Sequence, residues 1–534
     1  MTVDYQVGGF VQPRKKRGRR GACGQARLAV YISDMSKNIT RQISRRFFLG
    51  SAVAAVAGLP ALAAPPTASL RPVLRGDDLF KRSIPDAAGI ISDVGLTGDV
   101  AFALADVETG VWLECASEQM GIPPASVAKA ITALYALDVL GAEHRFETRL
   151  LATGGVEGGE VQGDLILVGG GDPTLDTDAL ATMAANLKAA GVIGVKGAFK
   201  VHEATLPVLR QIDPEQPDHL GYNPGVSGVA LNYNRVHFEW KRGGNGYGVT
   251  MEGRTQKYRP AVAMASMQIA DRSAPVYTYE DRGGRDNWTV AKGALGSGGA
   301  RWLPVRKPGL YAGDVFATLA GAQGIRLGRP EMIDALPVAE VLVTQHSGDL
   351  RGILKDMLKY STNLTAEMVG LSASQKRLGA VSDLRTSAAE MNRWAIATLG
   401  MVGPKMVDHS GLGDDSRMMA LDMAGALMRM KDSGLRPILK EIVLRDAKGR
   451  PDKSHPVKVE AKTGTLNFVS ALAGYVTTPK GRVLAFAIFT ADPDKRAKVS
   501  RAERESPPGA SGWNSRAKKV QQGLLERWGM LYDV

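Results

Sequence analysis

The sequence predicts an α/β fold of the α+β type, in which a domain with an antiparallel sheet and a helical cluster is split by a largely β insert. Three observations lead to this prediction. Strand-like segments lie near both ends of the body of the chain, at 99–115 and 459–491, and helix-like segments fill 345–445 between them. Residues 146–335 alternate short apolar runs with glycine, which is typical of strands and turns. We therefore expect the two terminal segments to share one sheet.

The chain of 534 residues is too long for one ordinary core, so two or three domains are expected. We predict a leader with an export signal at 1–63, a first part of the split domain at 64–145, an inserted region of one or two domains at 146–335, and a second part at 336–534. The leader has 11 Lys and Arg against 2 Asp and Glu, a net charge of +9 out of the chain's +13. The nearly balanced remainder argues against a nucleic-acid partner.

The end of the leader has the layout of a cleaved export signal. Paired Arg45 and Arg46 precede an apolar run over 47–62, with small residues at 61–63. The pattern resembles the twin-arginine type and predicts an exported, periplasmic protein. The run is too short for a comfortable membrane span. An uncut N-terminal anchor, or peripheral association with the membrane, stays as an alternative.

The first elements of the body are two strands and a helix. Residues 99–115 predict two strands joined by a Glu-Thr-Gly turn. The segment PPASVAKAITALYAL that follows predicts a helix from about Ser126 to Leu140, ended by Gly141. Within the insert, one helix is predicted near 177–191.

The second part of the split domain is helical before it returns to strands. Two helices over 348–379 should flank a break at 360–363. Residues 459–478 are predicted to form one strand, which a Pro-Lys-Gly turn joins to a second strand in an antiparallel hairpin. The remaining helices are predicted at 383–400, 420–434, 437–445 and 515–531.

Ser126 and Lys129 are the first candidate site residues. Ser126 lies in the first turn of its helix, where free backbone N–H groups and the helix dipole favour negative charge on its oxygen. Lys129 shares that face, and burial among Ala, Val, Ile and Leu would make its amine a proton acceptor. The same S-x-x-K spacing recurs at Ser515 and Lys518, in a polar terminal helix to which we assign no role. The spacing alone therefore does not distinguish a catalytic pair from a helix-terminal serine beside an extended lysine.

The break between the two helices supplies the second candidate group, Ser361 and Asn363. A hydroxyl there can relay a proton, and an amide can both donate to a substrate carbonyl and hold a lysine. The alternative is an ordinary helix N-cap.

The third group is Lys462, Thr463, Gly464 and Thr465 on a predicted strand. A lysine and two hydroxyls on one strand suit recognition of a carboxylate, and the glycine would let a substrate backbone approach the strand edge. The alternative is an exposed polar start to a strand.

In order, S-x-x-K, S-x-N and K-T-G resemble the three-part signature of serine penicillin-recognising enzymes. The chain resembles the low-molecular-mass, class C penicillin-binding proteins that act as D-alanyl-D-alanine carboxypeptidases and endopeptidases and carry a large insert. The resemblance covers most of 75–534 and includes GGGDPTL at 169–175, YNPGVSGVALNYN at 222–234 and DHSGLGDDSRM at 408–418. It implies a penicillin-binding transpeptidase-like domain, with the last block shaping the roof of the site.

The resemblance also implies roles for single residues. Ser126 would be the acylated nucleophile and Lys129 its general base, while Ser361 would relay a proton to the leaving D-alanine and Asn363 would position the acyl side chain. The terminal carboxylate would bind to Lys462, Thr463 and Thr465 on the strand that includes Gly464, and the oxyanion hole would be the backbone N–H groups of Ser126 and Thr465. No metal and no organic cofactor is implied. The partners would be peptidoglycan stem peptides ending in D-Ala-D-Ala, with β-lactams as inhibitors, and a homodimer stays open.

Two other functions compete with a peptidase. A β-lactamase shares the three motifs but places the second far sooner after the first, whereas here 235 residues separate Ser126 from Ser361. The other alternative is a non-catalytic homologue that binds peptidoglycan, which the intact motif residues disfavour.

Overall fold

A computed structural model describes residues 83–446 and 448–533. The residues from Pro85 onward form one compact unit. The predicted leader at 1–63 and its export signal lie outside the described residues. Among the helices described, none is both long and apolar enough to cross a membrane.

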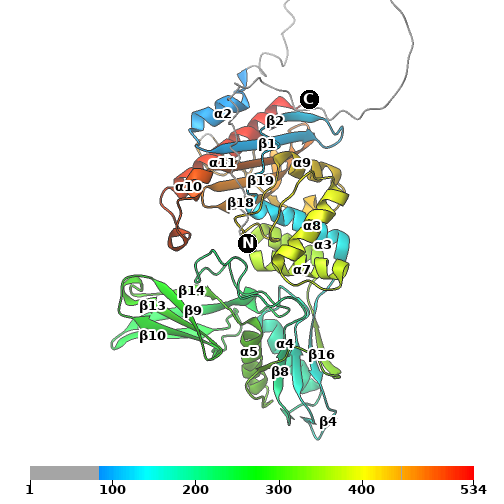
Figure 1. The fold of residues 1–534 in the computed structure, drawn as a ribbon, viewed down its shortest axis with the longest axis vertical. Helices are drawn as coiled ribbons and strands as arrows, with labels where there is room; N and C mark the ends of the chain where they lie inside the picture. The colour runs from blue at the N-terminus through cyan, green and yellow to red at the C-terminus, as the bar shows by residue number, and fades with distance from the viewer. Residues whose placement is uncertain (1–82, 447, 534) are drawn as a thin grey trace, which may run out of the picture. The chain divides into compact units, whose positions relative to one another are not determined.

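A six-stranded sheet, in the order β17-β18-β19-β20-β1-β2, organises the split domain (Figure 1). Neighbouring strands are antiparallel throughout, and β1 pairs with β20 along its whole length. The first and last strands of the domain therefore share one sheet, as the predicted fold class requires. In sheet order the strands span Lys440–Glu441, Lys458–Leu466, Val469–Thr477, Val483–Ala491, Asp99–Asp106 and Trp112–Ala116.

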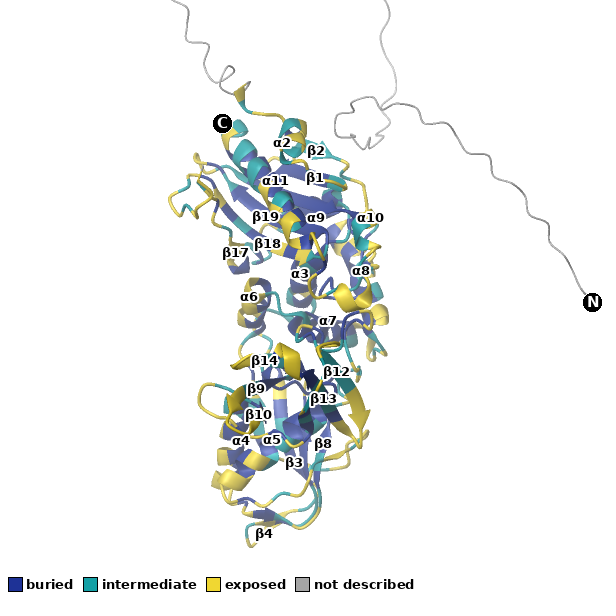
Figure 2. Ribbon diagram, turned by 90° about the vertical axis from the view of Figure 1, so that its left-hand side faces the viewer, coloured by how far each residue is buried: buried dark blue, intermediate teal, exposed yellow. Residues whose placement is uncertain are grey.

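Helices cover both faces of this sheet, which explains why its central strands are buried along nearly their whole length (Figure 2). Small residues such as Ala101 and Ala103 point to the face where α9 (Ala420–Arg429) and the helical cluster pack. The intervening large residues point to the opposite face, under α11 (Ala510–Leu531). There Trp528 packs against Phe102 and Phe486, with ring centroids 5.7 and 5.9 Å away.

The helical cluster surrounds α3 (Ala128–Leu140), whose residues from Ala128 to Ala136 are all buried. A helix that is apolar on every side must be enclosed by other elements, and α6, α7 and α8 supply that enclosure. A left-handed Ser361, with φ of 59°, ends α6 two residues before α7 begins, so the predicted break at 360–363 is confirmed. The three helices span Leu350–Tyr360, Asn363–Leu378 and Leu384–Leu399.

The insert has its own core, built on a five-stranded sheet in the order β15-β8-β6-β3-β16. Two three-stranded sheets with longer strands, β10-β9-β14 and β11-β13-β12, also belong to the insert (Figure 1). A third, β4-β5-β7, consists of the two-residue strands Val156–Glu157, Glu160–Val161 and Gly194–Val195. The strand β16 (Glu340–His346) follows residue 335 and pairs with β3. The other strands of the larger sheet are Glu147–Ala152 (β3), Leu165–Val168 (β6), Phe199–His202 (β8) and Glu331–Met332 (β15); those of the smaller sheets are Arg235–Gly243, Gly246–Glu252, Ala265–Ala270, Tyr277–Arg282, Arg285–Ala291 and Gly298–Pro304 (β9 to β14).

The predicted insert helix is α4 (Thr177–Ala189), and a second helix, α5 (Pro308–Ala322), was not predicted. Two predictions of secondary structure in the split domain were wrong. The segment 459–478 is not one strand, because Asn467 and Phe468, with φ of 56° at the phenylalanine, turn the chain between β18 and β19. Residues 437–445 do not form a helix, because the chain leaves a short 3₁₀ turn at Arg436–Ile438 to pair β17 with β18.

Candidate active site

Ser126 lies at the point where a 3₁₀ turn, Ala125–Val127, runs directly into α3. Ala125 has a φ of 46°, a left-handed conformation that is unfavourable for alanine. Such strain persists only where the surroundings hold the backbone firmly, so the local chain around Ser126 is fixed from outside.

Two glycines pack directly against that backbone. A Cβ on Gly411, which has a φ of 74°, would lie 1.9 Å from the carbonyl oxygen of Ala125. A Cβ on Gly464 would lie 2.7 Å from the carbonyl oxygen of Pro124 and 3.0 Å from the nitrogen of Ser126. The glycine of the K-T-G motif therefore makes room for the backbone of Pro124 and Ser126, whereas the sequence suggested room for a substrate backbone.

The Lys129 side chain is fully buried, and its Nζ lies within hydrogen-bonding distance of three oxygens. It is 2.9 Å from Ser126 Oγ, 2.8 Å from Asn363 Oδ1 and 2.8 Å from the Ser410 carbonyl oxygen. The amide and peptide oxygens accept only, so they take two N–H groups of the lysine. When Lys129 is neutral, its lone pair is left for the proton of Ser126.

Burial lowers the pKa of Lys129 to about 8, against the opposing attraction of Glu367 and Asp408. Both carboxyls are themselves buried, and burial raises the pKa of each. The Glu367 carboxyl accepts hydrogen bonds from the backbone N–H groups of His409 and Ser410, at 2.9 Å each. Glu367 therefore fixes the two peptide groups before the Ser410 carbonyl, and Asp408 holds the peptide unit of that carbonyl by accepting from the Gly411 N–H at 2.7 Å.

Ser361 and Lys462 form a second pair beside the first. Lys462 on β18 is 1% exposed, and its Nζ donates to Ser361 Oγ at 3.0 Å and to the Thr463 carbonyl oxygen at 2.6 Å. Burial, followed by repulsion from Lys129 and Lys440, lowers the pKa of Lys462 to about 6. A lysine that exchanges its proton so readily, joined to a hydroxyl, can pass protons in either direction.

The remaining predicted residues, Thr463 and Thr465, lie on the exposed side of β18. Thr465 lines the same cavity as Ser126, Ser361 and Asn363. Thr463 does not line that cavity, and it lines a recess on another side of the strand.

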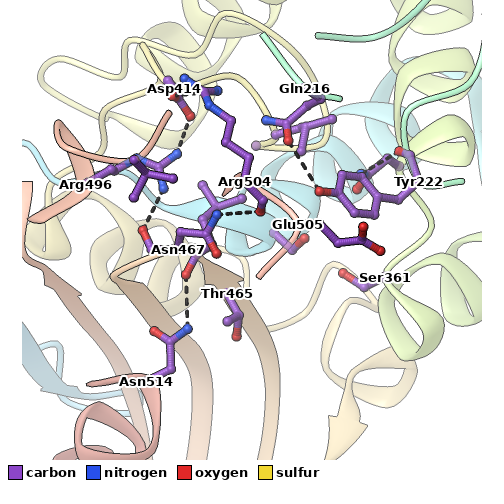
Figure 3. A pocket seen from close by; sticks show the side chains of 16 residues that line it. Gln216, Tyr222, Ser361, Asp414, Thr465, Asn467, Arg496, Arg504, Glu505 and Asn514 are labelled. Atoms are coloured by element: carbon purple, nitrogen blue, oxygen red, sulfur yellow. Dashed lines mark hydrogen bonds and ion pairs between the residues drawn. The ribbon is translucent and has the colours of Figure 1, made fainter. Parts of the chain in front are cut away.

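The cavity in front of Ser126 has a volume of about 300 Å³ and a polar, charged wall (Figure 3). Arg496 pairs with Asp414 and donates to the carbonyl oxygen of Asn467 at 2.7 Å. Arg504 lies 3.1 Å from the same aspartate, so the segment after β20 is tied to the 408–418 block and to the β18–β19 turn. Nothing in the three motifs predicts this charged wall.

The insert reaches the catalytic groups through the loop at 210–223. The Asn363 amide Nδ2 donates to the carbonyl oxygen of Tyr222 at 3.0 Å, which orients the amide so that its oxygen faces Lys129. Arg306, 5% exposed, holds this loop from inside. Its guanidinium donates to the carbonyl oxygens of Arg210, Asn223 and Asp218 at 3.2, 2.6 and 2.5 Å.

Comparison with known proteins assigns the chain to a family. Residues 87–506 match the D-Ala-D-Ala carboxypeptidase 3 (S13) family. The chain belongs to this family. Membership confirms the resemblance drawn from the three motifs and the prediction of a hydrolase.

Two relatives of the S13 chain match most of its length. A D-alanyl-D-alanine carboxypeptidase from Actinomadura sp. (strain R39) is 29% identical over 439 residues, which cover 76% of this chain and 80% of the relative. Carboxypeptidase DacB from Mycolicibacterium smegmatis is 24% identical over 516 residues, 89% of this chain and 94% of the relative. The crystal structure of penicillin binding protein 4 from Haemophilus influenzae aligns with a TM-score of 0.64 and 20% identity, covering 78% of this chain and 98% of that one. This last match confirms the predicted fold.

The S13 site includes groups that sequence reasoning missed. Glu367 follows Asn363 by one helical turn, so the two share a face of α7, and this spacing was the available signal. The sequence has no signal for the Ser410 carbonyl oxygen, because every residue has a backbone carbonyl and the residue type does not show which one accepts a hydrogen bond. The 408–418 block was expected to shape the roof of the site, and its Ser410 carbonyl oxygen also accepts a hydrogen bond from Lys129.

Substitution of Gly464 by alanine should slow acylation strongly while leaving most of the fold intact. The new Cβ would press on Pro124 and Ser126 and displace the nucleophile. We expect the acylation rate with benzylpenicillin to fall by roughly 100-fold or more. Thermal unfolding and intact mass together would check this, and an alanine variant with normal acylation would contradict the assigned packing.

Acylation should depend on pH through Lys129. Because the neutral amine is the base, the rate should rise with pH through about 8 and level off above that value. Stopped-flow acylation by benzylpenicillin between about pH 6 and pH 10 would measure the profile. Glu367→Gln removes a charge that raises the pKa of Lys129, so the midpoint should move to lower pH. A profile that is flat across this range would exclude Lys129 as the base.

Arg306→Met should slow acylation without touching a reacting group. Loss of the guanidinium leaves buried carbonyl oxygens unpaired, at about 1–3 kcal/mol, and loosens the loop that orients Asn363. We expect roughly a 10-fold slower acylation at saturating penicillin. Arg285→Met, at an exposed arginine of the same insert, is the matched control and should acylate normally. Equal rates in both variants would show that the loop does not orient Asn363.

Proposed function

We propose that the chain is a serine-type D-alanyl-D-alanine carboxypeptidase that acts on peptidoglycan stem peptides through an acyl-enzyme on Ser126. The observation that carries this proposal is the buried Lys129 amine, which faces Ser126 Oγ while two acceptors hold its N–H groups. Membership in the S13 family and the names of the similar carboxypeptidases support the substrate class.

Acylation begins when Lys129 takes the hydroxyl proton of Ser126. The freed oxygen attacks the carbonyl carbon of the penultimate D-alanine and forms a tetrahedral intermediate, whose oxyanion the N–H groups of Ser126 and Thr465 would stabilise. The carbon–nitrogen bond then breaks, and the leaving amine takes a proton from Ser361. Lys462, at 3.0 Å, resupplies that hydroxyl. The products of this step are an ester on Ser126 and free D-alanine.

Deacylation uses the same groups in reverse. The proton that Lys129 took from Ser126 first replaces the one that Lys462 and Ser361 gave to the leaving amine, so that Lys129 is neutral again. Its amine then takes a proton from a water molecule that attacks the ester carbonyl. The ester bond breaks, Ser126 Oγ recovers a proton from Lys129, and the shortened peptide leaves. An endopeptidase reaction follows the same steps with the amine of a peptide cross-link as the leaving group, and we propose it as a second activity of the same site.

A β-lactam would acylate Ser126 in the same way, because its ring carbonyl presents the same electrophile. Similarity to the Haemophilus influenzae penicillin binding protein 4, which has been crystallised in complex with a β-lactam, supports this. We further propose that the enzyme works in the periplasm, exported through its twin-arginine-like leader. The paired arginines, apolar run and small residues of the leader support that location.

Benzylpenicillin should form one persistent adduct on Ser126. Intact mass spectrometry of the mature chain, from about Ala64, would follow the adduct over time, and peptide mapping would locate it. Ser126→Ala should lose the adduct and at least roughly 10⁴-fold in peptide hydrolysis, with the fold retained.

The matched control is Ser515→Ala, which removes the serine of the second S-x-x-K spacing and should change nothing. An adduct that forms and clears rapidly would favour a β-lactamase. Failure to form any adduct would favour a non-catalytic homologue.

A further inference from the structure

The segment between β20 and α11, residues 492–509, forms a strap that extends from the split domain toward the insert (Figure 1). Its regular structure is one turn of helix, α10 (Pro493–Arg496), and a 3₁₀ turn at Arg501–Glu503. The structure describes every residue from 493 to 509, and Pro507 is the one fully buried residue among them. A segment with so little apolar burial depends on polar contacts for its position.

The strap forms part of the wall of the catalytic cavity. The Asn467 side chain, in the β18–β19 turn, donates to the carbonyl oxygen of Arg504 at 2.7 Å, which fixes the strap to the split domain. Figure 3 shows Arg504 and Glu505 between Asn467 and the insert residues Gln216 and Tyr222. Four side chains of the strap line the same cavity as Ser126: Arg496, Val499, Arg504 and Glu505.

The insert holds the Glu505 end of the strap. Oε1 of Glu505 accepts from Arg301 at 2.7 Å, and Oε2 lies 2.8 Å from His219 Nε2. Both partners pack on the Tyr277 ring, with the His219 ring centroid 5.2 Å away and the Arg301 guanidinium 5.0 Å from the centroid. Burial raises the pKa of Glu505, but the hydrogen bonds from His219 and Arg301 outweigh burial and lower it. Glu505 is therefore a carboxylate held between two groups that share one aromatic support.

A second tie joins the strap to the insert loop at 210–223. Arg501 donates to the carbonyl oxygen of Gln216 at 2.8 Å and to Asp218 at 3.2 Å. This is the loop that orients Asn363. Each of these ion pairs is partly exposed and contributes little alone, but together they act on one short segment. Substitution of two partners, or high salt, should therefore release the strap from the insert.

The acyl arm of a substrate has to share the cavity with the strap. Asn363, the residue predicted to position the acyl side chain, lines the cavity beside Ser126. From there the cavity continues along Thr465 and Asn467 of the β18 side to the strap, and its volume is about 300 Å³. A slim arm fits such a space, whereas an arm that branches close to the scissile bond would press against the strap.

We propose that the strap determines which acyl arms the enzyme accepts, because its ties to the insert keep the cavity too narrow for an arm branched close to the scissile bond. The proposal rests on the proposed function and names the substrate class of that site: unbranched acyl arms enter, and branched ones are excluded while Glu505 and Arg501 remain bound to the insert.

The test compares two thioesters with the same leaving group, N-phenylacetyl- and N-triphenylacetyl-D-alanyl thioglycolate. The measured quantity is the ratio of kcat/KM for the slim ester to that for the branched one. The wild type should prefer the slim ester by roughly 10-fold or more. In the double variant Arg301→Met/Arg501→Met, whose two positions do not line the cavity, this preference should fall roughly 5-fold through faster turnover of the branched ester. The slim ester should keep its rate to within roughly 2-fold.

Lys498→Met is the matched control, because Lys498 is exposed on the same strap and lies outside these ties and the cavity lining. It should keep the preference of the wild type. Sodium chloride at about 1 M should lower the preference of the wild type and leave that of the double variant unchanged, because salt screens exposed ion pairs.

A double variant that keeps the wild-type preference would overturn the proposal, and so would equal losses of activity toward both esters. Normal penicillin adducts and thermal unfolding would establish that the variants are folded. A wild type that forms the penicillin adduct but shows no preference between the esters would overturn the role of the strap alone. If the wild type forms no adduct and hydrolyses neither ester, the proposed function itself fails.

Discussion

The burial of one lysine amine determines the arrangement of the rest of the site. An ammonium with no exposed surface is costly unless acceptors surround it, so Lys129 requires oxygens on every side. These come from three segments far apart in sequence, at Ser126, Asn363 and Ser410. Each of these segments must itself be held in place. The glycines packed against the strained backbone at Ala125 hold the first segment, and the buried Glu367 holds the segment that includes Ser410. Burial destabilises the charged form of Lys129, and for the same reason it lowers the pKa of the amine, which suits it to act as a base. Stability and the proposed catalysis therefore depend on the same hydrogen bonds.

The insert contributes to the hydrogen bonds that surround Lys129. Asn363 can turn its oxygen toward Lys129 only if its NH₂ group has a partner on the other side, and the Tyr222 carbonyl oxygen is that partner. The loop that presents it has no regular structure, and a buried guanidinium replaces the hydrogen bonds that a sheet would give it. The insert is therefore coupled to the groups around Lys129 through the Asn363 amide.

The sequence predicted the parts of the fold that local periodicity governs. Uniformly apolar strands at both ends, the buried helix at 126–140 and the break at 360–363 all have strong local signals, and the structure has them. The predictions were wrong where contacts between residues far apart in the sequence determine the local structure. Phe468 turns the chain without glycine or proline, and within the segment 437–445, predicted as a helix, Lys440 and Glu441 pair with β18. In the site, Glu367 was missed because a glutamate on a helix is ordinarily a surface residue, and only the fold buries it.

The division of the K-T-G-T strand illustrates how a linear motif differs from its three-dimensional meaning. Read as text, a lysine and two threonines form one polar cluster, but strand geometry sends Lys462 to one side and the threonine hydroxyls to the other. The separation has an electrostatic consequence. Lys462 must exchange a proton with Ser361, and it already lies close enough to Lys129 for repulsion to lower its pKa. Alternation along one strand thus places the Lys462 amine beside Ser361 on the buried side and leaves the hydroxyls of Thr463 and Thr465 on the other side.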